Sequence, residues 1–572
     1  MKATAQLSPP TQRPIIHQPE VAASLSRSAW LLFAGMAAIA LYLSYRNLGL
    51  YPVVMADEWE YSLYSRLLPF SKSPIPSYLF FWIFKQTNHC GGSYTDCARL
   101  FNAILFVTSG PFIYAVSRRV VQPAAAAFIA LLSLLGPVNT YTAYFMPEAM
   151  YFLGFWILSW FVIVYRKSSP WFYGSVIGLI LAGLSMVKVH AIFLAPGVAA
   201  AIIASALLSH GQGFAKVRKI IATLVAIGIA AVVSRLLLGY AFAGTAGLHV
   251  LGQKYGEVAD SSLTVSSLLH LIGQAFFVVR GHILGLALLF AVPLACLGAW
   301  QGDPADSERT DDDFVIKIYT IAMLAFLLLV TAYYTASVNG QPHEAIGRMH
   351  YRYYNFGLPL LLIVTAGEWS TARKRTRLYI TLPIAAVVGG LAIYAMRALT
   401  TQYAPNVIDS PEVQAAIFNK PLMYFIVSLG LGVLLVWAFN RRRGAQLFLF
   451  VFLPLSTLGM GRIANIGLRD RMHPSSFERA GLAIHGLLTK QERDKVAVFG
   501  SNDVEMYKTL YQIDSPHATL GVLPEGVPLE MKMIPGQFDW VLVVGNHAVP
   551  AELQLQLRRE DYVLFKRDGT TP

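Results

Sequence analysis

The stretch VVMADEWEYSLYSRLLPFSKSPIPSYLFFWIF occupies residues 53–84 of a 572-residue chain, shortly after the first long apolar run. Two adjacent carboxylates, Asp57 and Glu58, stand where this apolar run gives way to polar sequence. If the apolar run crosses a bilayer, these carboxylates lie where a membrane segment meets water. Their setting therefore depends on whether the rest of the chain is a membrane protein.

Composition places the chain outside the range of soluble domains. Apolar residues make up 55% of the sequence and charged residues only 13%, whereas soluble domains contain about 25% charged residues. The apolar runs are continuous and near the roughly 20 residues that a helical span needs, and they lack the alternation of barrel strands. The sequence predicts a polytopic α-helical membrane protein with about thirteen transmembrane helices. The expected spans are residues 29–45, 98–117, 124–141, 149–165, 171–187, 191–208, 220–238, 283–300, 315–335, 356–372, 378–396, 421–439 and 445–463.

Basic clusters between these spans predict the topology. With a cytoplasmic amino terminus, the clusters that follow even-numbered spans face the cytoplasm, as the bias of Lys and Arg toward cytoplasmic loops requires. The formal net charge of +13 thus indicates topology rather than nucleic-acid binding. The acidic stretch QGDPADSERTDDD, residues 301–313, is expected on the same inner side. The clusters are Arg118 and Arg119, Arg166 and Lys167, Lys216 with Arg218 and Lys219, Arg373 to Arg375, and Arg441 to Arg443.

This topology predicts a multi-pass membrane protein, which we expect in the plasma membrane, as a bacterial inner-membrane protein. Residues 1–28 are expected to form a cytoplasmic polar tail, 29–463 a transmembrane domain with its first outer loop at 46–97, and 464–572 a periplasmic domain. Residues 263–280 are too polar and too interrupted for a confident span, and they fit either an interfacial or a re-entrant helix. A span there would invert everything downstream and place the arginine clusters outside.

The last hundred or so residues have the pattern of a small α/β domain. PSSFERAGLAIHGLL opens with Ser475 and Glu478 at capping-box spacing. VAVFG, DWVLVVG and YVLFK read as strands, and VEMYKTLYQ and AELQLQLRRE as helices. A glycine-rich phosphate loop is absent from this sequence, so we assign the domain no nucleotide function.

Helical spacing in EWEYSLYSRLL predicts a helix along the membrane surface, with Trp59, Leu63 and Leu67 on its apolar side. An Asp at its start has an ordinary explanation: Asp57 could be the N-cap, with Glu60 completing a capping box. Capping and chemistry are compatible, because a cap position also fixes the carboxylate at the membrane surface.

The continuation of this motif resembles the first outer loop of GT-C glycosyltransferases, most closely the branch of protein O-mannosyltransferases and aminoarabinose transferases (family 39). The resemblance rests on Asp57 and Glu58, then Tyr61, then Ser65 and Arg66, and then Lys72, Pro74 and Pro76 before an aromatic segment. In this chain the Lys-Pro-Pro motif of the family is interrupted by Ser73 and Ile75. The resemblance implies a GT-C-like fold and a polyprenyl-phosphate-linked sugar as donor.

Two further outer segments fit the same family. YFMPEAMYF places Glu148 at the outer start of a span, where family members carry a second acidic residue. HEAIGRMHYRYYNFGLPLLL resembles the Arg-Tyr and Pro pattern of a late outer loop, although an interfacial anchor with an aromatic belt explains such a segment equally well. Its candidate substrate-binding residues are His343, Glu344, Arg348, His350, Arg352 and Tyr353.

Transfer of a sugar from a lipid phosphate requires a base for the acceptor hydroxyl and cations for the departing phosphate. We predict Asp57 as the base and Glu58 as a catalytic carboxylate that orients the acceptor or Asp57. Arginine binds phosphate through a planar fork, which favours Arg348 and Arg352. Lys72 and Lys188 would act as point charges. Lys188 and the nearby His190 lie in the turn VKVHA, where snorkelling to the headgroups is the alternative explanation.

Cysteines and metal ligands carry less information. Cys90 and Cys97 share the first outer loop, where they form either a disulfide or two free thiols. A divalent metal between Asp57 and Glu148 is conceivable but not favoured, and we predict no cofactor.

We therefore predict an integral membrane glycosyltransferase that acts on a lipid, glycan or protein acceptor. A transporter or flippase for lipid-linked glycans would place ionisable groups near the middle of its spans, whereas here they gather at the ends. A ligase of whole glycans would use similar donors on a different fold. These two classes remain the alternatives.

Overall fold

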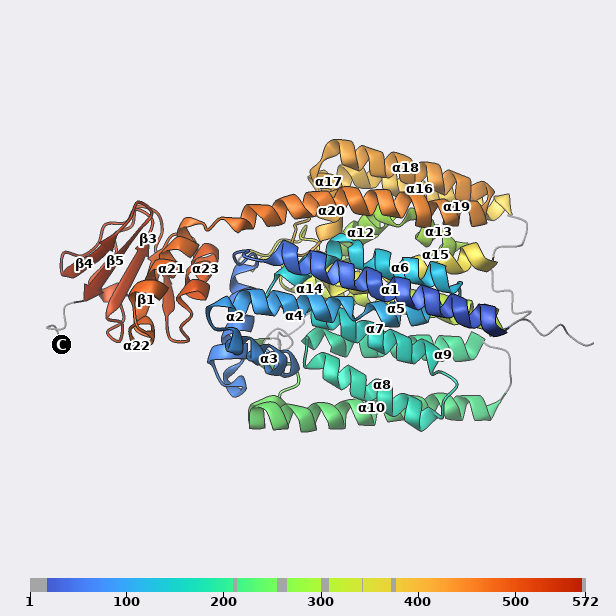
Figure 1. Ribbon diagram of the computed structural model, residues 1–572, viewed down its shortest axis with the longest axis horizontal. Coiled ribbons are helices and arrows are strands. Elements are labelled where there is room, and N and C mark those ends of the chain that lie inside the picture. The colour runs from blue at the N-terminus through green and yellow to red at the C-terminus, as the bar shows by residue number, and fades with distance from the viewer. Residues whose placement is uncertain are drawn as a thin grey trace, which may run out of the picture.

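The computed structural model describes residues 18–208, 213–254, 265–299, 308–341, 343–371 and 377–567. Long helices run side by side as a bundle, and a small α/β domain stands at one end of it (Figure 1). We call this end of the bundle the domain end and the opposite end the far end. Of the predicted features, residues 1–17, 301–307 and the Arg373 to Arg375 cluster lie outside the described residues.

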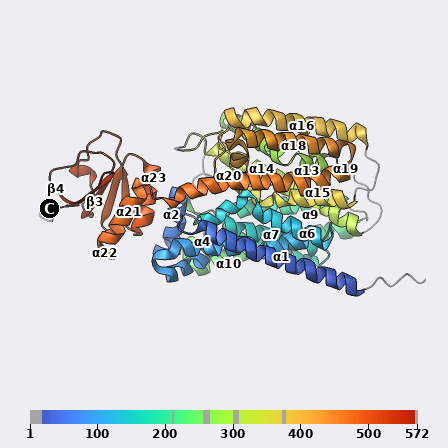
Figure 2. The ribbon, with the colours of Figure 1, turned by 45° about the horizontal axis from the view of Figure 1, so that its top comes forward.

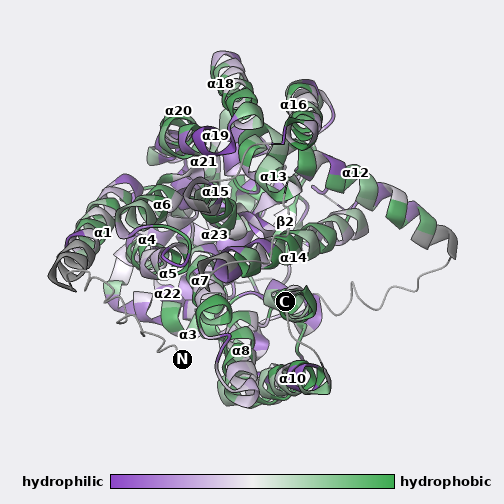
Figure 3. Ribbon diagram, turned by 90° about the vertical axis from the view of Figure 1, so that its right-hand side faces the viewer, coloured by the Kyte–Doolittle hydropathy of each residue, from purple (hydrophilic) through white to green (hydrophobic). Residues whose placement is uncertain are grey.

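Hydrophobic residues predominate along the bundle helices (Figure 3), and many large apolar side chains on them are exposed. Leu237 on α10 and Val387 on α16 are 67% and 64% exposed, which suits a surface bathed in lipid rather than water. The bundle consists of α1 (Gln18–Asn47), α4 (Tyr94–Val107), α5 (Gly110–Ser117), α6 (Pro123–Leu135), α7 (Glu148–Val164), α8 (Pro170–Ser185), α9 (Leu194–Leu208), α10 (Phe214–Ala243), α12 (Val265–Leu289), α13 (Ala291–Gly298), α14 (Glu308–Ser337), α15 (Pro359–Thr371), α16 (Leu378–Thr401), α18 (Lys420–Phe439), α19 (Arg441–Leu447) and α20 (Leu453–Arg469).

The structure confirms a polytopic helical membrane protein but not the count of thirteen spans. Among the described residues, nine helices are long and apolar enough to cross a membrane. The number is ten if α6 and the bent short helix η4 (Pro137–Ala143) form one span. Helices α7 and α8 are apolar but shorter. The prediction therefore holds for the class of protein, whereas several predicted spans are built from short or broken helices.

Helix α12 corrects the interpretation of residues 263–280. From Val265 onward this segment is neither a separate interfacial helix nor a re-entrant piece, because it continues without a break to Leu289. The predicted span 283–300 instead breaks after Leu289 and resumes as α13. Pro293 gives the reason, since a proline ring clashes with the carbonyl group four residues earlier, here that of Leu289.

Ion pairs tie helix ends together at the far end. The acidic residues at the start of α14 lie among arginines from other helices, on the side where the sequence placed them together. We call this set the far-end network. Its pairs are Arg166 with Asp311 and Asp312, Arg119 with Asp312 (2.8 Å), Lys317 with Asp313 (2.7 Å) and Arg441 with Glu368 (2.5 Å).

Short helices form the first loop at the domain end. The predicted surface helix is α2, which continues as one π-helical turn, η1. Its residue Trp59 is buried, and its ring packs edge-on against Tyr511 of the carboxyl-terminal domain, with centroids 6.5 Å apart. The apolar side of α2 thus contacts that domain. The loop comprises α2 (Met55–Ser62), η1 (Leu63–Leu67), η2 (Phe70–Lys72), α3 (Tyr78–Phe84) and η3 (Lys85–Ser93).

The carboxyl-terminal domain contains one five-stranded sheet in the order β2-β1-β3-β5-β4. β1 pairs in parallel with β2 and β3, whereas β5 pairs antiparallel with β3 and β4. AELQLQLRRE was predicted as a helix, but it contains β4, because LQLQL alternates with the period of a strand. The elements are α21 (Ser476–Leu487), α22 (Lys490–Arg493), β1 (Val496–Gly500), α23 (Asp503–Ile513), β2 (Thr519–Val522), β3 (Trp540–Val544), β4 (Leu553–Arg558) and β5 (Tyr562–Arg567).

Helix α20 leads from the bundle into this domain, which docks on the first loop through α23 (Figure 2). Arg66 is nearly buried, forms an ion pair with Asp514, and lies 3.3 Å over the ring of Tyr94. The Tyr94 hydroxyl donates to the backbone oxygen of Tyr511 at 3.0 Å. The predicted capping box of Ser475 and Glu478 begins α21.

Candidate active site

Asp57 meets an arginine from the other half of the chain. It lies in the first turn of α2, where Val54 and not Asp57 is the N-cap residue. Its Oδ2 instead accepts a hydrogen bond of 3.1 Å from Nη1 of Arg352, 295 residues further along the chain. Arg352 lies on the short helix η7 (Tyr351–Tyr353). Folding thus brings the two most informative segments of the sequence into contact.

Asp409 lies between two arginines. Its Oδ2 accepts hydrogen bonds from Nε of Arg348 (2.6 Å) and Nδ2 of Asn406 (2.9 Å). Its Oδ1 is 2.9 Å from Nε of Arg352, close enough for an ion pair although the angle is not that of a hydrogen bond. The backbone N–H of Arg352 also donates to the Asp409 carbonyl at 2.7 Å. Burial alone would raise the pKa of the Asp409 carboxyl, but Arg352, His350 and Arg348 together hold this pKa below its usual range.

Arg348 is paired with a second carboxylate. Its Nη1 donates to Glu344 at 2.8 Å. Burial would raise the pKa of Glu344, yet His350 and Arg348 lower this pKa below its usual value. His350 Nδ1 lies 2.9 Å from the Thr335 hydroxyl, and its Nε2 is 3.6 Å from Glu344.

A second ion pair adjoins Arg352. Lys188 Nζ donates to Glu148 Oε1 at 2.9 Å and lies 4.8 Å from the centre of the Tyr353 ring. The other face of the site is aromatic, since Tyr353 stacks on His190 with centroids 4.3 Å apart. Oε2 of the buried Glu148 has no hydrogen-bond partner among the described residues. We call the residues of these ion pairs the domain-end cluster; they are Asp57, Glu148, Lys188, Glu344, Arg348, Arg352 and Asp409.

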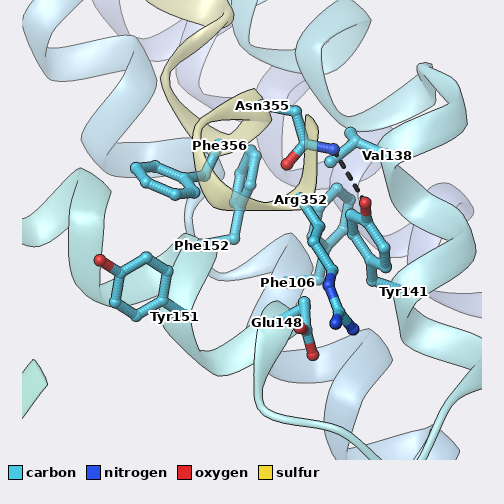
Figure 4. A pocket seen from close by; sticks show the side chains of 9 residues that line it. All are labelled: Phe106, Val138, Tyr141, Glu148, Tyr151, Phe152, Arg352, Asn355 and Phe356. Atoms are coloured by element: carbon cyan, nitrogen blue, oxygen red, sulfur yellow. Dashed lines mark hydrogen bonds between the residues drawn. The ribbon is translucent and has the colours of Figure 1, made fainter. Parts of the chain in front are cut away.

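A small cavity borders this cluster (Figure 4). The carboxylate of Glu148 and the guanidinium group of Arg352 lie side by side at one edge of it. Aromatic rings form most of the remaining wall, and Asn355 donates to the Tyr141 hydroxyl at 3.1 Å. Charged groups that face an apolar wall interact strongly, because little water screens them. The cavity has room for about one water molecule, with a free volume of about 10 Å³, so it marks a polar edge against an aromatic wall.

Comparisons with known proteins give the fold. No protein-family model matches the chain, and no curated protein matches its sequence. Among solved structures, ArnT from Cupriavidus metallidurans bound to undecaprenyl phosphate is similar at a TM-score of 0.52 and 15% identity, over 95% of this chain and 99% of that chain. The chain has the fold of ArnT. The GT-C-like fold predicted from the first loop is therefore confirmed.

Two further structures match less closely. ArnT from the same organism in the apo state gives a TM-score of 0.47 at 15% identity, over 94% of this chain and 98% of that chain. The oligosaccharyltransferase from Archaeoglobus fulgidus in the apo form gives 0.41 at 12% identity, over 92% of this chain and 70% of that chain. At such identities a likeness concerns the fold, so the chemistry must be argued from the residues themselves.

Glu58 does not share the surroundings of Asp57, although the two are adjacent in sequence. Its carboxylate is fully buried and accepts hydrogen bonds from the backbone N–H groups of Val53 (2.6 Å), Val54 (2.7 Å) and Phe145 (2.8 Å). Burial raises the pKa of Glu58, whereas Arg99 and these N–H groups oppose the rise. Three backbone donors occupy the carboxylate, so its geometry fits the fixing of two loops better than the predicted contact with an acceptor.

Two other predicted residues point elsewhere. Lys72 is exposed at the end of η2, and its side chain takes no part in the contacts described for the domain-end cluster. The imidazole of His343 turns toward the carboxyl-terminal domain, where Nε2 is 3.2 Å from Asp503.

The first loop also contains a disulfide bond, between Cys90 and Cys97. It closes the segment that holds Tyr94, whose hydroxyl reaches the carboxyl-terminal domain. Within the described residues, no group of three or more His, Cys, Asp and Glu side chains is arranged to hold a metal ion.

Sequence reasoning missed Asp409 and Glu412. Glu412 is buried at the start of α17 (Pro411–Phe418), and Asn355 donates to it at 3.2 Å. Burial raises the pKa of Glu412 to about 7, against the effect of its own backbone N–H and of Asn355. Both residues lie in NVIDSPEV, between two long apolar runs. The segment was overlooked because an acidic Ser-Pro sequence is typical of an ordinary helix start. The feature that could have revealed it is a pair of carboxylates in a loop that is predicted on the same side of the membrane as Asp57.

Proposed function

We propose that this protein is an integral membrane glycosyltransferase that moves a sugar from a polyprenyl-phosphate carrier to a lipid, glycan or protein acceptor. The contact between Asp57 and Arg352 carries this proposal, since it joins a proton acceptor to a phosphate-binding group beside an aromatic-walled cavity. The fold shared with ArnT supports it, because that ArnT structure was bound to undecaprenyl phosphate.

In the proposed reaction, Asp57 takes the proton from the acceptor hydroxyl as its oxygen attacks the anomeric carbon of the sugar. The bond between that carbon and the phosphate oxygen breaks, and the polyprenyl phosphate leaves with the electron pair. The proton on Asp57 then passes to the released phosphate or to water.

Arg352 and Lys188 would stabilise the charge that develops on the leaving phosphate. Glu148 would orient Lys188 through its Oε1, and its Oε2 has no hydrogen-bond partner among the described residues. Glu344, His350, His190 and Tyr353 would line the site and fix the arginines.

The proposed location follows the distribution of basic residues. We place the domain end in the periplasm of a bacterial cell, with residues 29–463 as the membrane domain and 464–572 as the periplasmic domain. A lipid-linked donor can then diffuse in the membrane to a site at its outer surface.

The test is transfer by the purified full-length protein in detergent, offered a panel of radiolabelled polyprenyl-phosphate sugars. Asp57→Asn is expected to lower the transfer rate about 10²- to 10⁴-fold, the usual contribution of a general base. Glu60→Gln is the matched control on the same helix, because Glu60 pairs with Lys254. Equal rates for wild type and Asp57→Asn would remove Asp57 from the mechanism. Movement of lipid-linked sugar across vesicles without any transfer would favour the flippase alternative.

A further inference from the structure

Arg352 is shared between two carboxylates that differ in almost every respect. Asp409 is fully buried, receives Arg348 and Asn406 as well, and is also bound to Arg352 through the backbone. Asp57 is 34% exposed, and among the described ion pairs Arg352 is its partner. The contact of Arg352 with Asp409 is therefore buried and supported by several bonds, whereas its contact with Asp57 is partly exposed to solvent.

We propose that the donor phosphate displaces Asp57, and not Asp409, from Arg352, so that donor binding itself releases the base. This inference rests on the proposed function and specifies the order of its events. Without donor, the carboxylate of Asp57 is held by the guanidinium group. With donor, the phosphate takes that place and Asp57 is free to accept the proton of the acceptor.

The burial of the two carboxylates determines which of them leaves. Releasing Asp409 from Arg352 would leave Oδ1 of Asp409 without a cationic partner in a dry interior, while Oδ2 stays paired with Arg348. Releasing Asp57 costs far less, because water can solvate it where it is exposed. A phosphate offers oxygens in the bidentate arrangement that a guanidinium group prefers, so it is a strong competitor for the Asp57 position.

The charges of the domain-end cluster also favour displacement of Asp57. Among the described residues, the domain-end cluster contains four carboxylates, Asp57, Glu148, Glu344 and Asp409, and three cations, Lys188, Arg348 and Arg352. A phosphate added without displacement would lie beside Asp57 and repel it. Asp57 and the donor therefore compete for one guanidinium group, and Asp409 keeps that group in place for either.

This competition predicts opposite effects of two similar substitutions on the binding of undecaprenyl phosphate. Asp57→Asn removes the competitor, so the full-length protein in detergent should bind undecaprenyl phosphate about threefold to tenfold more tightly, although it no longer transfers sugar. Asp409→Asn loosens Arg352 and Arg348, so binding should weaken by about tenfold or more. Microscale thermophoresis measures both constants, and Glu60→Gln should match wild type.

Weaker or unchanged binding of undecaprenyl phosphate by Asp57→Asn would overturn the inference. This measurement can be interpreted even if Asp409→Asn fails to fold. Carboxyl-directed labelling of Asp57, followed by peptide mass spectrometry, is a second readout. Labelling of wild type should rise when undecaprenyl phosphate is added, and a fall or no change would contradict the exchange. A wild-type protein that transfers sugar while these tests fail would retain the proposed function without this order of events. Absence of transfer from every donor would instead contradict the function itself.

Discussion

The domain-end cluster and the far-end network are both built from acids and bases that separate helices bring together, yet they differ in what surrounds them. At the far end, Arg166 is met by two carboxylates, and the pairs tie helix ends to one another. At the domain end, Arg352 pairs with two carboxylates beside a cavity, and one oxygen of Glu148 has no hydrogen-bond partner within the part of the chain that the structure describes. We infer from this comparison that ion pairs alone do not indicate a site, and that the adjoining cavity makes the domain end the better candidate.

Substitution of one arginine in each region tests this distinction most strongly. Arg352→Gln should lower sugar transfer by about 10²- to 10³-fold, because it removes a donor aimed at the leaving phosphate. Arg166→Gln should leave the transfer rate per folded molecule near wild type and lower the free energy of unfolding by about 1–3 kcal/mol. Transfer assays and thermal unfolding in detergent measure the two effects. A loss of transfer in Arg166→Gln without destabilisation would break the comparison.

Within the domain end, Glu58 can be compared with its neighbour Asp57. Glu58→Gln should destabilise the protein by about 1–3 kcal/mol, because an amide has one acceptor oxygen for three backbone donors and turns its own N–H groups toward them. The measurement is the melting temperature in detergent. Transfer by the molecules that remain folded should stay within about tenfold of wild type, unlike that of Asp57→Asn. A stable Glu58→Gln protein with no transfer would instead assign Glu58 to the chemistry.

Glu412 should make stability depend on pH at the domain end. Burial raises its pKa to about 7 in the folded protein, from an ordinary value of 4.5, so folding favours the protonated form. The stability from this group is fully present below about pH 4.5 and is lost as the pH rises through 7. Between pH 6 and 8.5 the melting temperature of wild type should therefore fall by a few degrees relative to that of Glu412→Gln. Parallel curves for the two proteins would show that Glu412 does not titrate in this range.

The exposed pair of Lys254 and Glu60 should matter least. Their atoms are 3.0 Å apart, but the two side chains are 49% and 30% exposed. Lys254→Gln should change the free energy of unfolding by less than about 1 kcal/mol, and less still at high salt, because water and ions screen the pair. Thermal unfolding at low and high salt checks this. A larger, salt-independent loss would mean that this pair belongs with the buried contacts of the cluster.

The structure brings some of the predicted site residues together and separates others, for one physical reason. Asp57 and Arg352 were predicted for the same site because each lies in a segment that resembles a known family, and the structure places them in contact. Glu58 was predicted to orient the acceptor or Asp57, but successive helix residues point in different directions, and its carboxylate meets three backbone N–H groups. Asp409 was missed because its importance comes from Arg348 and Arg352, which are distant in sequence.

The same holds for the fold. Local pattern was sufficient for the capping box at Ser475 and for the buried strands of the last domain, whereas β4 was misread because its flanking residues suit a helix. The helix break after Leu289 also has a local cause, Pro293. It was not predicted because the expected span was drawn from hydropathy, which stays high on both sides of the break.

By itself, the sequence determined that this chain is a helical membrane protein with a small α/β domain after its last apolar run. Long apolar runs leave a backbone few alternatives to helices in lipid, because every N–H and C=O group must be paired within its own segment. Only the tertiary structure decided which carboxylate meets an arginine and which is occupied by backbone N–H groups. The partner of each carboxylate depends on burial and on residues that are distant in the sequence, and local sequence patterns reveal neither.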